Sequence, residues 1–333
     1  MKMLIVEPVE PLSLSSSPIT GIELLSSVNP LPLPLPTTVA GALGACLGIE
    51  LMSSDPIKGI EELVDKLLDR LRCREPLLLG PLTQFNAENR WSEPMVNIGW
   101  KLFANPKCIS KELHIDTEKC EESGDLARFE AIIATGVSIE RKVSPIGAMG
   151  EKKIKIGYLY KYPISVYKVI QASVAKPARP RFLYLLNCDE KIDGYVRFGG
   201  EGRIVKMYTR ELEAVKGMEM PLNISKELYI ALSPIPLLPI REEALYLDSQ
   251  SMLGLNFVSE IIGIPQQSKE KPPKVVVENI GLGYYEVKRV RRPLILALPP
   301  GTIVKTKPIN GAEDSLLASL YKIGFATLYP LAV

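Results

Sequence analysis

Histidine is nearly absent from this chain of 333 residues, and its single histidine is His114. A Ser-His-Asp triad, a Cys-His pair or a histidine general base would each have to use this one residue. It lies between Glu112 and Asp116 in an irregularly patterned segment, and no nucleophile signature lies nearby. This context favours a surface or capped histidine over a catalytic one.

Nucleotide-binding motifs are missing as well. The sequence has no G-x-x-x-x-G-K loop, and Gly281-Leu282-Gly283 lacks the third glycine of a dinucleotide fingerprint. No paired-carboxylate or D-x-D motif stands out among the acidic residues. We therefore expect a protein that is not an enzyme and that uses neither a cofactor nor a metal ion.

The cysteines never approach C-x-x-C spacing, since they stand at Cys46, Cys73, Cys108, Cys120 and Cys188. Neither a zinc site nor a disulfide framework is readable from them, which is typical of the reducing cytoplasm. Every apolar run is interrupted by proline, glycine or charge before it reaches bilayer length. The apolar start is too short for a signal peptide. We expect a cytoplasmic protein without a membrane partner.

The charge of the chain is almost balanced, with a formal net charge of +2 at pH 7. A charge this small produces no global field that would attract nucleic acid, so any such role must rest on local basic clusters. Hydrophobic residues make up 46% and charged residues 23% of the sequence, which is typical of a globular protein.

The pattern of the elements predicts an α+β fold of two tandem ferredoxin-like (RRM-like) domains. The first covers residues 1–218 with a helical insertion at about 52–128, and the second covers 219–333. In the first we expect a strand at the start, helices at 39–48 (capped by Thr37-Thr38), 57–74 and 181–193, and strands at 129–139, 153–162 and 204–208. In the second we expect strands at 228–232, 284–291, 293–305 and 324–329, a loosely helical region at 241–263, a linker at 266–274 and a helix at 316–321.

One glycine-rich stretch suggests a ligand. Its sequence is Arg197-Phe198-Gly199-Gly200-Glu201-Gly202-Arg203. Glycines lack Cβ atoms, so their amides can approach a phosphate or another backbone closely, and arginine forks suit phosphate or base edges. The alternative is a tight turn with incidental charges.

Basic clusters stand at several predicted loops and strand ends. Arg141-Lys142 and Lys152-Lys153 bracket the loop of a predicted projecting hairpin, and Lys288-Arg289-Val290-Arg291-Arg292 ends a predicted strand. Each cluster alone is typical of a solvated face. Together with the glycine loop on RRM-like units, they favour binding of an RNA backbone.

Several segments together resemble the RAMP superfamily of CRISPR proteins, in particular the family of subunit three of the type III-B Cmr effector complex. The matching pieces keep the family's order: residues 34–43, 135–139, 157–160, 198–203, 298–304 and Gly324-Phe325. The resemblance implies a non-catalytic subunit with two ferredoxin-like domains. Its implied partners are the 5′ repeat-derived tag of the guide RNA, the large polymerase-like subunit and the neighbouring backbone RAMP subunits.

The same resemblance implies residue roles. The loop with Gly199, Gly200, Gly202 and Arg203 would lie against the tag, and the helix start with Thr38 and Gly41 would adjoin it. The hairpin would form a thumb whose phosphate contacts are Arg141, Lys142, Lys152 and Lys153. The predicted RNA-binding set is completed by Arg197, Arg291 and Arg292.

Two other functions stay open at this stage. Related RAMP proteins can be metal-independent endoribonucleases that process guide RNA. Such enzymes commonly use histidine, so the simplest version of this activity would involve His114. The nearly neutral net charge leaves room for a scaffold that meets only proteins.

Overall fold

The computed structural model describes residues 1–15, 30–141, 152–199, 202–211, 217–240, 246–248, 251–308 and 314–331, and between 136 and 161 it describes the backbone alone. Its elements in chain order are β1 (Lys2–Pro8), α1 (Pro36–Cys46), α2 (Lys58–Leu71), β2 (Leu78–Ala87), β3 (Arg90–Trp91), β4 (Val96–Ile98), β5 (Leu102–Ala104), η1 (Pro106–Cys108), α3 (Thr117–Ser123), β6 (Leu126–Arg141), β7 (Lys152–Gln171), β8 (Val174–Leu186), β9 (Asp193–Phe198), β10 (Arg203–Glu211), η3 (Pro221–Asn223), β11 (Leu228–Ala231), β12 (Ile235–Leu237), η4 (Leu253–Leu255), β13 (Val258–Gly263), β14 (Glu278–Gly281), β15 (Tyr284–Tyr285), β16 (Val290–Arg291), β17 (Leu294–Leu298), β18 (Ile303–Thr306), α4 (Ser315–Lys322) and β19 (Leu328–Pro330). The fold is mixed α and β, rich in sheet and poor in helix.

The largest sheet among the described residues has β1 near its middle. Its strand order is β4-β5-β6-β7-β8-β1-β10-β9, and β2 also pairs with β8. β1 pairs antiparallel with β8 on one side and with β10 on the other. The predicted first strand is therefore confirmed. It pairs the start of the chain with two strands that lie more than 160 residues later.

Both faces of β1 are buried, each in a different core. Leu4 and Val6 belong to a cluster that includes α1 and α2. Met3 and Ile5 belong to a second cluster formed with strands of the C-terminal half. Because successive strand side chains point to opposite faces, the short apolar run of β1 serves both cores. Each core contains residues from before and after position 218, and the predicted domain division there stays a prediction.

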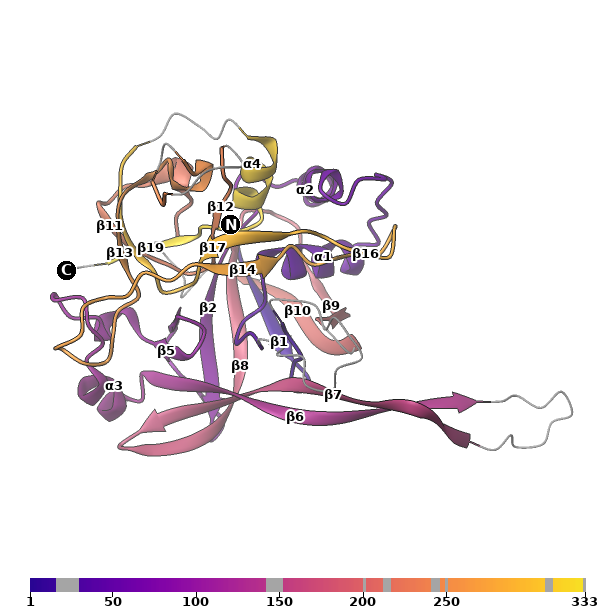
Figure 1. Ribbon diagram of the computed structural model, residues 1–333, viewed down its shortest axis with the longest axis horizontal. Coiled ribbons are helices and arrows are strands. Elements are labelled where there is room, and N and C mark those ends of the chain that lie inside the picture. The colour runs from indigo at the N-terminus through magenta and orange to yellow at the C-terminus, as the bar shows by residue number, and fades with distance from the viewer. Residues whose placement is uncertain are drawn as a thin grey trace, which may run out of the picture.

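A long antiparallel hairpin of β6 and β7 leaves the body of the molecule (Figure 1). Both predicted strands, at 129–139 and 153–162, are confirmed and extend further than expected. With 16 residues in β6, the hairpin is about 50 Å long at the usual rise of an extended chain.

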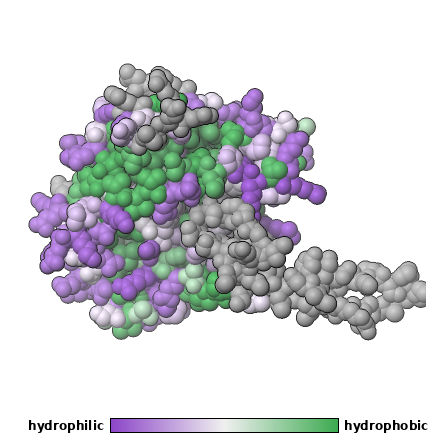
Figure 2. All heavy atoms as spheres, in the orientation of Figure 1, coloured by the Kyte–Doolittle hydropathy of each residue, from purple (hydrophilic) through white to green (hydrophobic). Residues whose placement is uncertain are grey.

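Strands of the C-terminal half form smaller sheets, ordered β13-β18-β11-β19 and β12-β17-β14. The predicted helix near 316–321 and the predicted strand near 228–232 are confirmed as α4 and β11. On the face shown in Figure 2, hydrophobic side chains gather over the strands of this half. Large exposed hydrophobic side chains in this half include Ile240, Leu247, Leu294 and Leu296.

Several sequence-based expectations about secondary structure are wrong. The strands expected at 284–291 and 293–305 are each interrupted, and they form the pairs β15 and β16, and β17 and β18. Residues 181–186, expected in a helix, belong to strand β8, and 258–263, expected in a loosely helical region, form β13. The region at 52–128, expected to be a helical insertion, contains α2 and α3 but also β2 to β5. An apolar run buried on both faces lacks periodicity, so its sequence does not separate strand from helix. The tandem ferredoxin-like arrangement is not confirmed by this element order.

Two disulfides also correct the sequence-based expectation. Cys73, which follows α2, is bonded to Cys188, which follows β8, across 115 positions. Cys108 is bonded to Cys120, and Cys46 is a free cysteine. Intracellular proteins of hyperthermophiles also contain disulfides, so these bonds do not assign a compartment. None of the helices in the described ranges has the length and apolar sequence needed to cross a bilayer.

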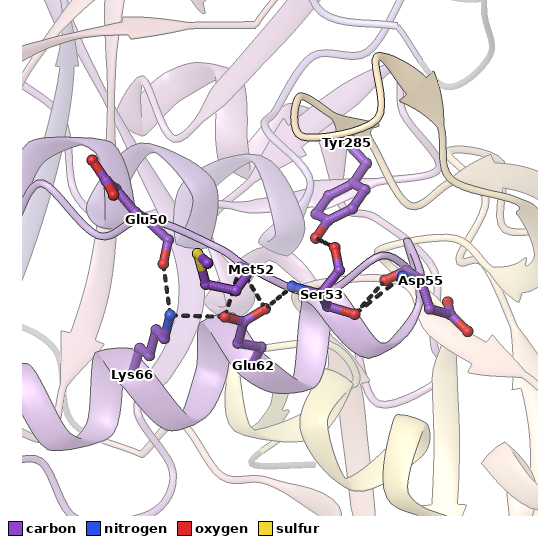
Figure 3. Close-up of polar contacts among 7 residues, drawn as sticks. All are labelled: Glu50, Met52, Ser53, Asp55, Glu62, Lys66 and Tyr285. Carbon is purple, nitrogen blue, oxygen red and sulfur yellow. Dashed lines mark hydrogen bonds and ion pairs between the residues drawn. The ribbon is translucent and has the colours of Figure 1, made fainter.

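A clamp around the start of α2 joins the N-terminal and C-terminal halves (Figure 3). Glu62 accepts hydrogen bonds from the backbone N–H groups of Met52 and Ser53 and pairs with Lys66 at 2.7 Å. The Tyr285 hydroxyl donates to the Ser53 carbonyl at 2.6 Å. A Cβ on Gly59 would lie 2.6 Å from the Tyr285 ring, so glycine lets the ring pack directly on the first turn of α2.

We predict that the Cys73–Cys188 bond stabilises the fold strongly. A bond that closes a loop of this size contributes about 4–5 kcal/mol in the chain-entropy estimate. Urea denaturation of Cys73→Ala/Cys188→Ala under oxidising conditions should therefore show a lower free energy of unfolding, whereas Cys46→Ala should show little change. Equal stability of the wild type with and without reductant would contradict this assignment.

We predict an acid-dependent contribution from Glu62. The hydrogen bond from Lys66, helped by the backbone N–H groups of Ser53 and Met52, lowers the pKa of Glu62 from 4.5 to about 2. A lowered folded-state pKa stabilises the fold above pH 4.5, and this stabilisation is lost as the pH falls toward 2. Melting temperatures of Glu62→Gln and the wild type should therefore converge between pH 4.5 and 2. The exposed Asp65→Asn on the same helix is the control, and a constant difference across this range would refute the prediction.

Candidate nucleic-acid interface

The glycine turn between β9 and β10 lies at the surface. Gly199 and Gly202 are exposed, and both have left-handed backbone conformations with φ of 68° and 61°. A Cβ on Gly199 would lie 2.8 Å from the Ser13 carbonyl oxygen, so this glycine lets the turn approach the segment after β1. Gly200 lies outside the described residues. The part of the turn that is described can therefore be reached by a ligand.

Arg203 is held by the protein's own side chains. Its guanidinium forms an ion pair with Glu10 and donates to the Tyr162 hydroxyl at 2.6 Å, and it lies 5.4 Å from the Tyr162 ring centroid. The Glu10 carboxylate also accepts from the backbone N–H of Ile204. Arg203 therefore ties β10 to the segment after β1 and to β7. Its predicted phosphate contact stays a prediction.

Arg197 has a different environment from Arg203. It is exposed on β9, and its backbone register places it opposite Ile204 of β10. Because Arg197 stands one residue before the buried Phe198, its side chain is on the face away from that core. Of the two arginines that flank the glycines, Arg197 is the one presented to solvent.

The base of the β6–β7 hairpin lies against the same region. The Tyr167 hydroxyl donates to the Pro32 carbonyl at 2.6 Å, and burial raises the pKa of this hydroxyl. The Ser165 N–H donates to the Leu12 carbonyl at 2.8 Å. With the Arg203–Tyr162 contact, these bonds attach the hairpin to the segments that adjoin the glycine turn.

The basic residues predicted on the thumb lie at the far end of this hairpin. In the backbone register, Arg141 stands opposite Lys152, and Lys153 stands opposite Glu140. Lys142 lies outside the described residues. The hairpin thus separates these positions from the glycine turn, so they would contact a different part of an extended ligand.

Helix α1 begins earlier than predicted. Its N-cap is Leu35 and Pro36 occupies the first turn, so Thr37 and Thr38 are not the caps. Proline suits this position because its missing N–H would have had no partner there. Thr37 is buried and Thr38 is half-buried.

Two glycines of α1 face different environments. A Cβ on Gly44 would lie 2.8 Å from Leu63 Cδ1, which explains this glycine by packing against α2. Gly41 is exposed, and a Cβ there would meet nothing within 4 Å. Glycine costs about 1 kcal/mol relative to alanine inside a helix. Packing among the described residues therefore does not explain Gly41.

The basic segment after β15 is attached beside α1 and α2. Arg292 Nε donates to the Pro56 carbonyl at 2.9 Å, and its guanidinium lies 4.9 Å from the Tyr285 ring centroid. Burial lowers the pKa of Arg292. Arg291 is exposed. Arg292 thus has a structural contact, and Arg291 is the member of the pair that faces solvent.

His114 is buried in the structure. Its Nδ1 lies 2.7 Å from the Ser110 hydroxyl and 3.8 Å from the Glu112 carboxylate. A side chain packed in this way has little access to a substrate.

The prediction missed a group of polar and aromatic side chains on β9 and β10. Tyr195, Lys206, Tyr208 and Arg210 line the face of these strands opposite the buried Val205. The alternation of Val205 and Met207 with Lys206 and Tyr208 was the signal that could have identified this face.

Two solved structures share the fold over the whole chain. A chain in the cryo-EM structure of the type III-B Cmr-beta bound to cognate target RNA has 21% sequence identity and a TM-score of 0.61, with 100% of this chain and 97% of that chain covered. A chain in the same complex bound to cognate target RNA and AMPPnP, state 1, has 21% identity, a TM-score of 0.60 and the same coverage. A chain of the Csm3-Csm4 subcomplex of the type III-A CRISPR-Cas interference complex covers 100% of both chains at 14% identity, with a TM-score of 0.40. No protein-family model and no curated protein matches the sequence. At these identities, the likeness to the Cmr-beta chains establishes the fold.

Proposed function

We propose that this chain is a non-catalytic RNA-binding RAMP subunit of a type III-B CRISPR effector complex. In this role it holds the 5′ repeat-derived tag of the guide RNA and docks on the large polymerase-like subunit and the neighbouring backbone subunits. The proposal assigns it the position of subunit three, in the cytoplasm.

The observation on which the proposal rests is the exposed glycine turn beside the base of a long hairpin. Gly199 and Gly202 leave the turn without Cβ bulk, so phosphates can approach its amides. Arg203 connects this turn to β7 through Tyr162. An RNA end held at the turn would thus have a fixed orientation relative to the hairpin, as binding a defined tag requires.

The fold likeness supports the same assignment. The Cmr-beta structures contain a chain of this fold in a complex bound to cognate target RNA, and the match runs over the whole of this chain. In other RNA-binding modules a glycine loop clamps the nucleotide backbone, and a glycine turn on a rigid sheet suits the same contact. We therefore place the RNA contacts on these parts of the chain.

The exposed hydrophobic side chains of the C-terminal half support protein partners. Leu294 and Leu296 on β17 are 47% and 38% exposed, and Ile240 is 47% exposed. Exposed apolar patches of this kind are typical of protein interfaces. The same surface also favours the alternative of a scaffold that contacts proteins alone, and RNA binding by the isolated chain separates the two functions.

We predict that Arg197→Ala weakens binding of an RNA that carries the 5′ repeat tag. Loss of one phosphate contact should lower the slope of log affinity against log salt by roughly 0.7. Filter binding at two salt concentrations measures both quantities. Arg70→Ala, which removes an exposed arginine of α2, is the control and should leave the slope unchanged. Identical slopes for Arg197→Ala and the wild type would remove this contact from the site.

We predict opposite effects of Gly41→Ala on stability and binding. Alanine should raise the free energy of unfolding by about 1 kcal/mol, because a Cβ there would meet no atom of the described residues within 4 Å. It should also weaken tag RNA binding several-fold if the RNA backbone approaches α1 at this residue. Urea denaturation and filter binding measure the two effects.

Gly44→Ala is the matched control for that variant. It should gain less stability than Gly41→Ala, because its Cβ would lie 2.8 Å from Leu63 Cδ1 and that methyl must shift, and it should leave the affinity of the folded protein unchanged. Unchanged RNA affinity of Gly41→Ala would exclude α1 from the interface.

A further inference from the structure

Strands β9 and β10 present an open face at one end of the central sheet. Val205 and Met207 of β10 are buried in the core that includes α1 and α2. The alternate residues of β10 must therefore point the other way. On that side the C-terminal half covers Met3 and Ile5 of β1, but Ile204 of β10 is 42% exposed. The end of the sheet at β9 (Figure 1) thus extends beyond the part of the sheet that the C-terminal half covers.

Cross-strand pairing brings the outward side chains into one row. Lys206 stands opposite Glu7 of β1 on one side and opposite Tyr195 of β9 on the other. Residues directly opposite each other in antiparallel strands share a face. Tyr195 is 68% exposed, which is high for a tyrosine on a strand. The face therefore offers an exposed aromatic ring at its edge.

Cations lie beside the tyrosine rings of this face. Lys206 Nζ lies 5.2 Å from the Tyr208 ring centroid and 5.9 Å from that of Tyr195. The Arg210 guanidinium lies 5.3 Å from the Tyr208 ring. A cavity of about 460 Å³ is lined by these strands and includes Lys206, Tyr208 and Arg210. Aromatic rings and cationic side chains therefore alternate over a short distance.

The two acidic residues beside this face each contact another side chain of the face. The Tyr208 hydroxyl donates to Glu7 at 2.9 Å, and Asp193 lies 3.7 Å from Lys206 Nζ. Arg181 of β8 interacts electrostatically with Glu7, Tyr208 and Arg210, but its guanidinium donates to Gln84 and lies 4.0 Å from the Trp91 ring centroid. Among the described residues of β9 and β10, the cations of this face are Arg197, Lys206 and Arg210, and the carboxylates beside them are Glu7 and Asp193. The local balance therefore suits an anionic ligand.

The chemistry of this face and its position next to the glycine turn both indicate which ligand it binds. Single-stranded nucleic acid is bound by aromatic side chains that stack on bases and by cations that contact phosphates. Arg197 and Tyr195 are two residues apart on β9, and this separation is about 7 Å along an extended strand. An RNA chain held at the turn would therefore reach Tyr195 with its next bases.

We propose that the outward face of β9 and β10 is a stacking platform for single-stranded RNA. Tyr195 and Tyr208 provide the stacking rings, and Lys206 and Arg210 contact the phosphates of the same nucleotides. The platform binds the bases that adjoin the segment held at the glycine turn. It rests on the proposed RNA-binding function and extends that function from the RNA backbone to bases.

The test measures binding of the full chain to a fluorescent RNA carrying the 5′ repeat tag. Tyr195→Ala should weaken binding about 5- to 160-fold, the usual range for loss of one stacked base, and Tyr195→Phe should retain the affinity. Tyr208→Phe keeps the ring and should bind nearly as well as the wild type. Tyr246→Ala, at a tyrosine that is 70% exposed in the C-terminal half, is the matched control and should have no effect.

An abasic RNA tests stacking directly. Removing in turn each base next to the tag should identify one position where the loss in wild-type affinity equals the loss caused by Tyr195→Ala. At that position the two losses should not add, because both remove the same contact. Additive losses at every position, or equal binding by Tyr195→Ala and the wild type, would overturn the platform. If the wild type itself does not bind the tagged RNA, the proposed function fails as well, so the two failures are distinguishable.

Discussion

The burial of β1 on both faces is the constraint on which the rest of the structure depends. Leu4 and Val6 enter one core while Met3 and Ile5 enter the other, and all four are at most 7% exposed. Burial of such side chains contributes about 1.5–3 kcal/mol each. A shift of one residue would exchange the two sets, so the register with β8 and β10 is specified by both cores at once.

The open surfaces follow from that arrangement. Helices α1 and α2 cover one face of the central sheet, and the C-terminal half covers the other face over β1. This cover does not extend over the outward face of β10 and β9, and the turn that joins these strands stays at the surface. The rigid sheet thus holds a loop and an exposed face in a fixed relation, which is how loops on a scaffold come to bind ligands.

In the glycine turn and in the basic segment after β15, one arginine contacts the protein and the other is exposed to solvent. Arg203 binds Glu10 and Tyr162, and Arg292 binds the Pro56 carbonyl and packs on Tyr285. Arg197 and Arg291 are exposed. The partly buried arginines position the turn and the C-terminal hairpin, and the exposed ones remain available to an anion. A charge cluster in the sequence therefore overstates the number of cations that a ligand can meet.

Local patterns were enough to predict α2, α4, β1, β10 and the hairpin strands, because each has one dominant period or clear flanking signals. The glycine turn and the candidate RNA-contacting segments were also recognisable from short-range sequence. The strand at 181–186 was not, because residues buried on both faces show no periodicity. Tertiary structure decided that Cys73 meets Cys188 and that Arg203 meets Glu10, since these partners lie 115 and 193 positions apart. It also decided which sheet face stays open, because the cover comes from segments far along the chain.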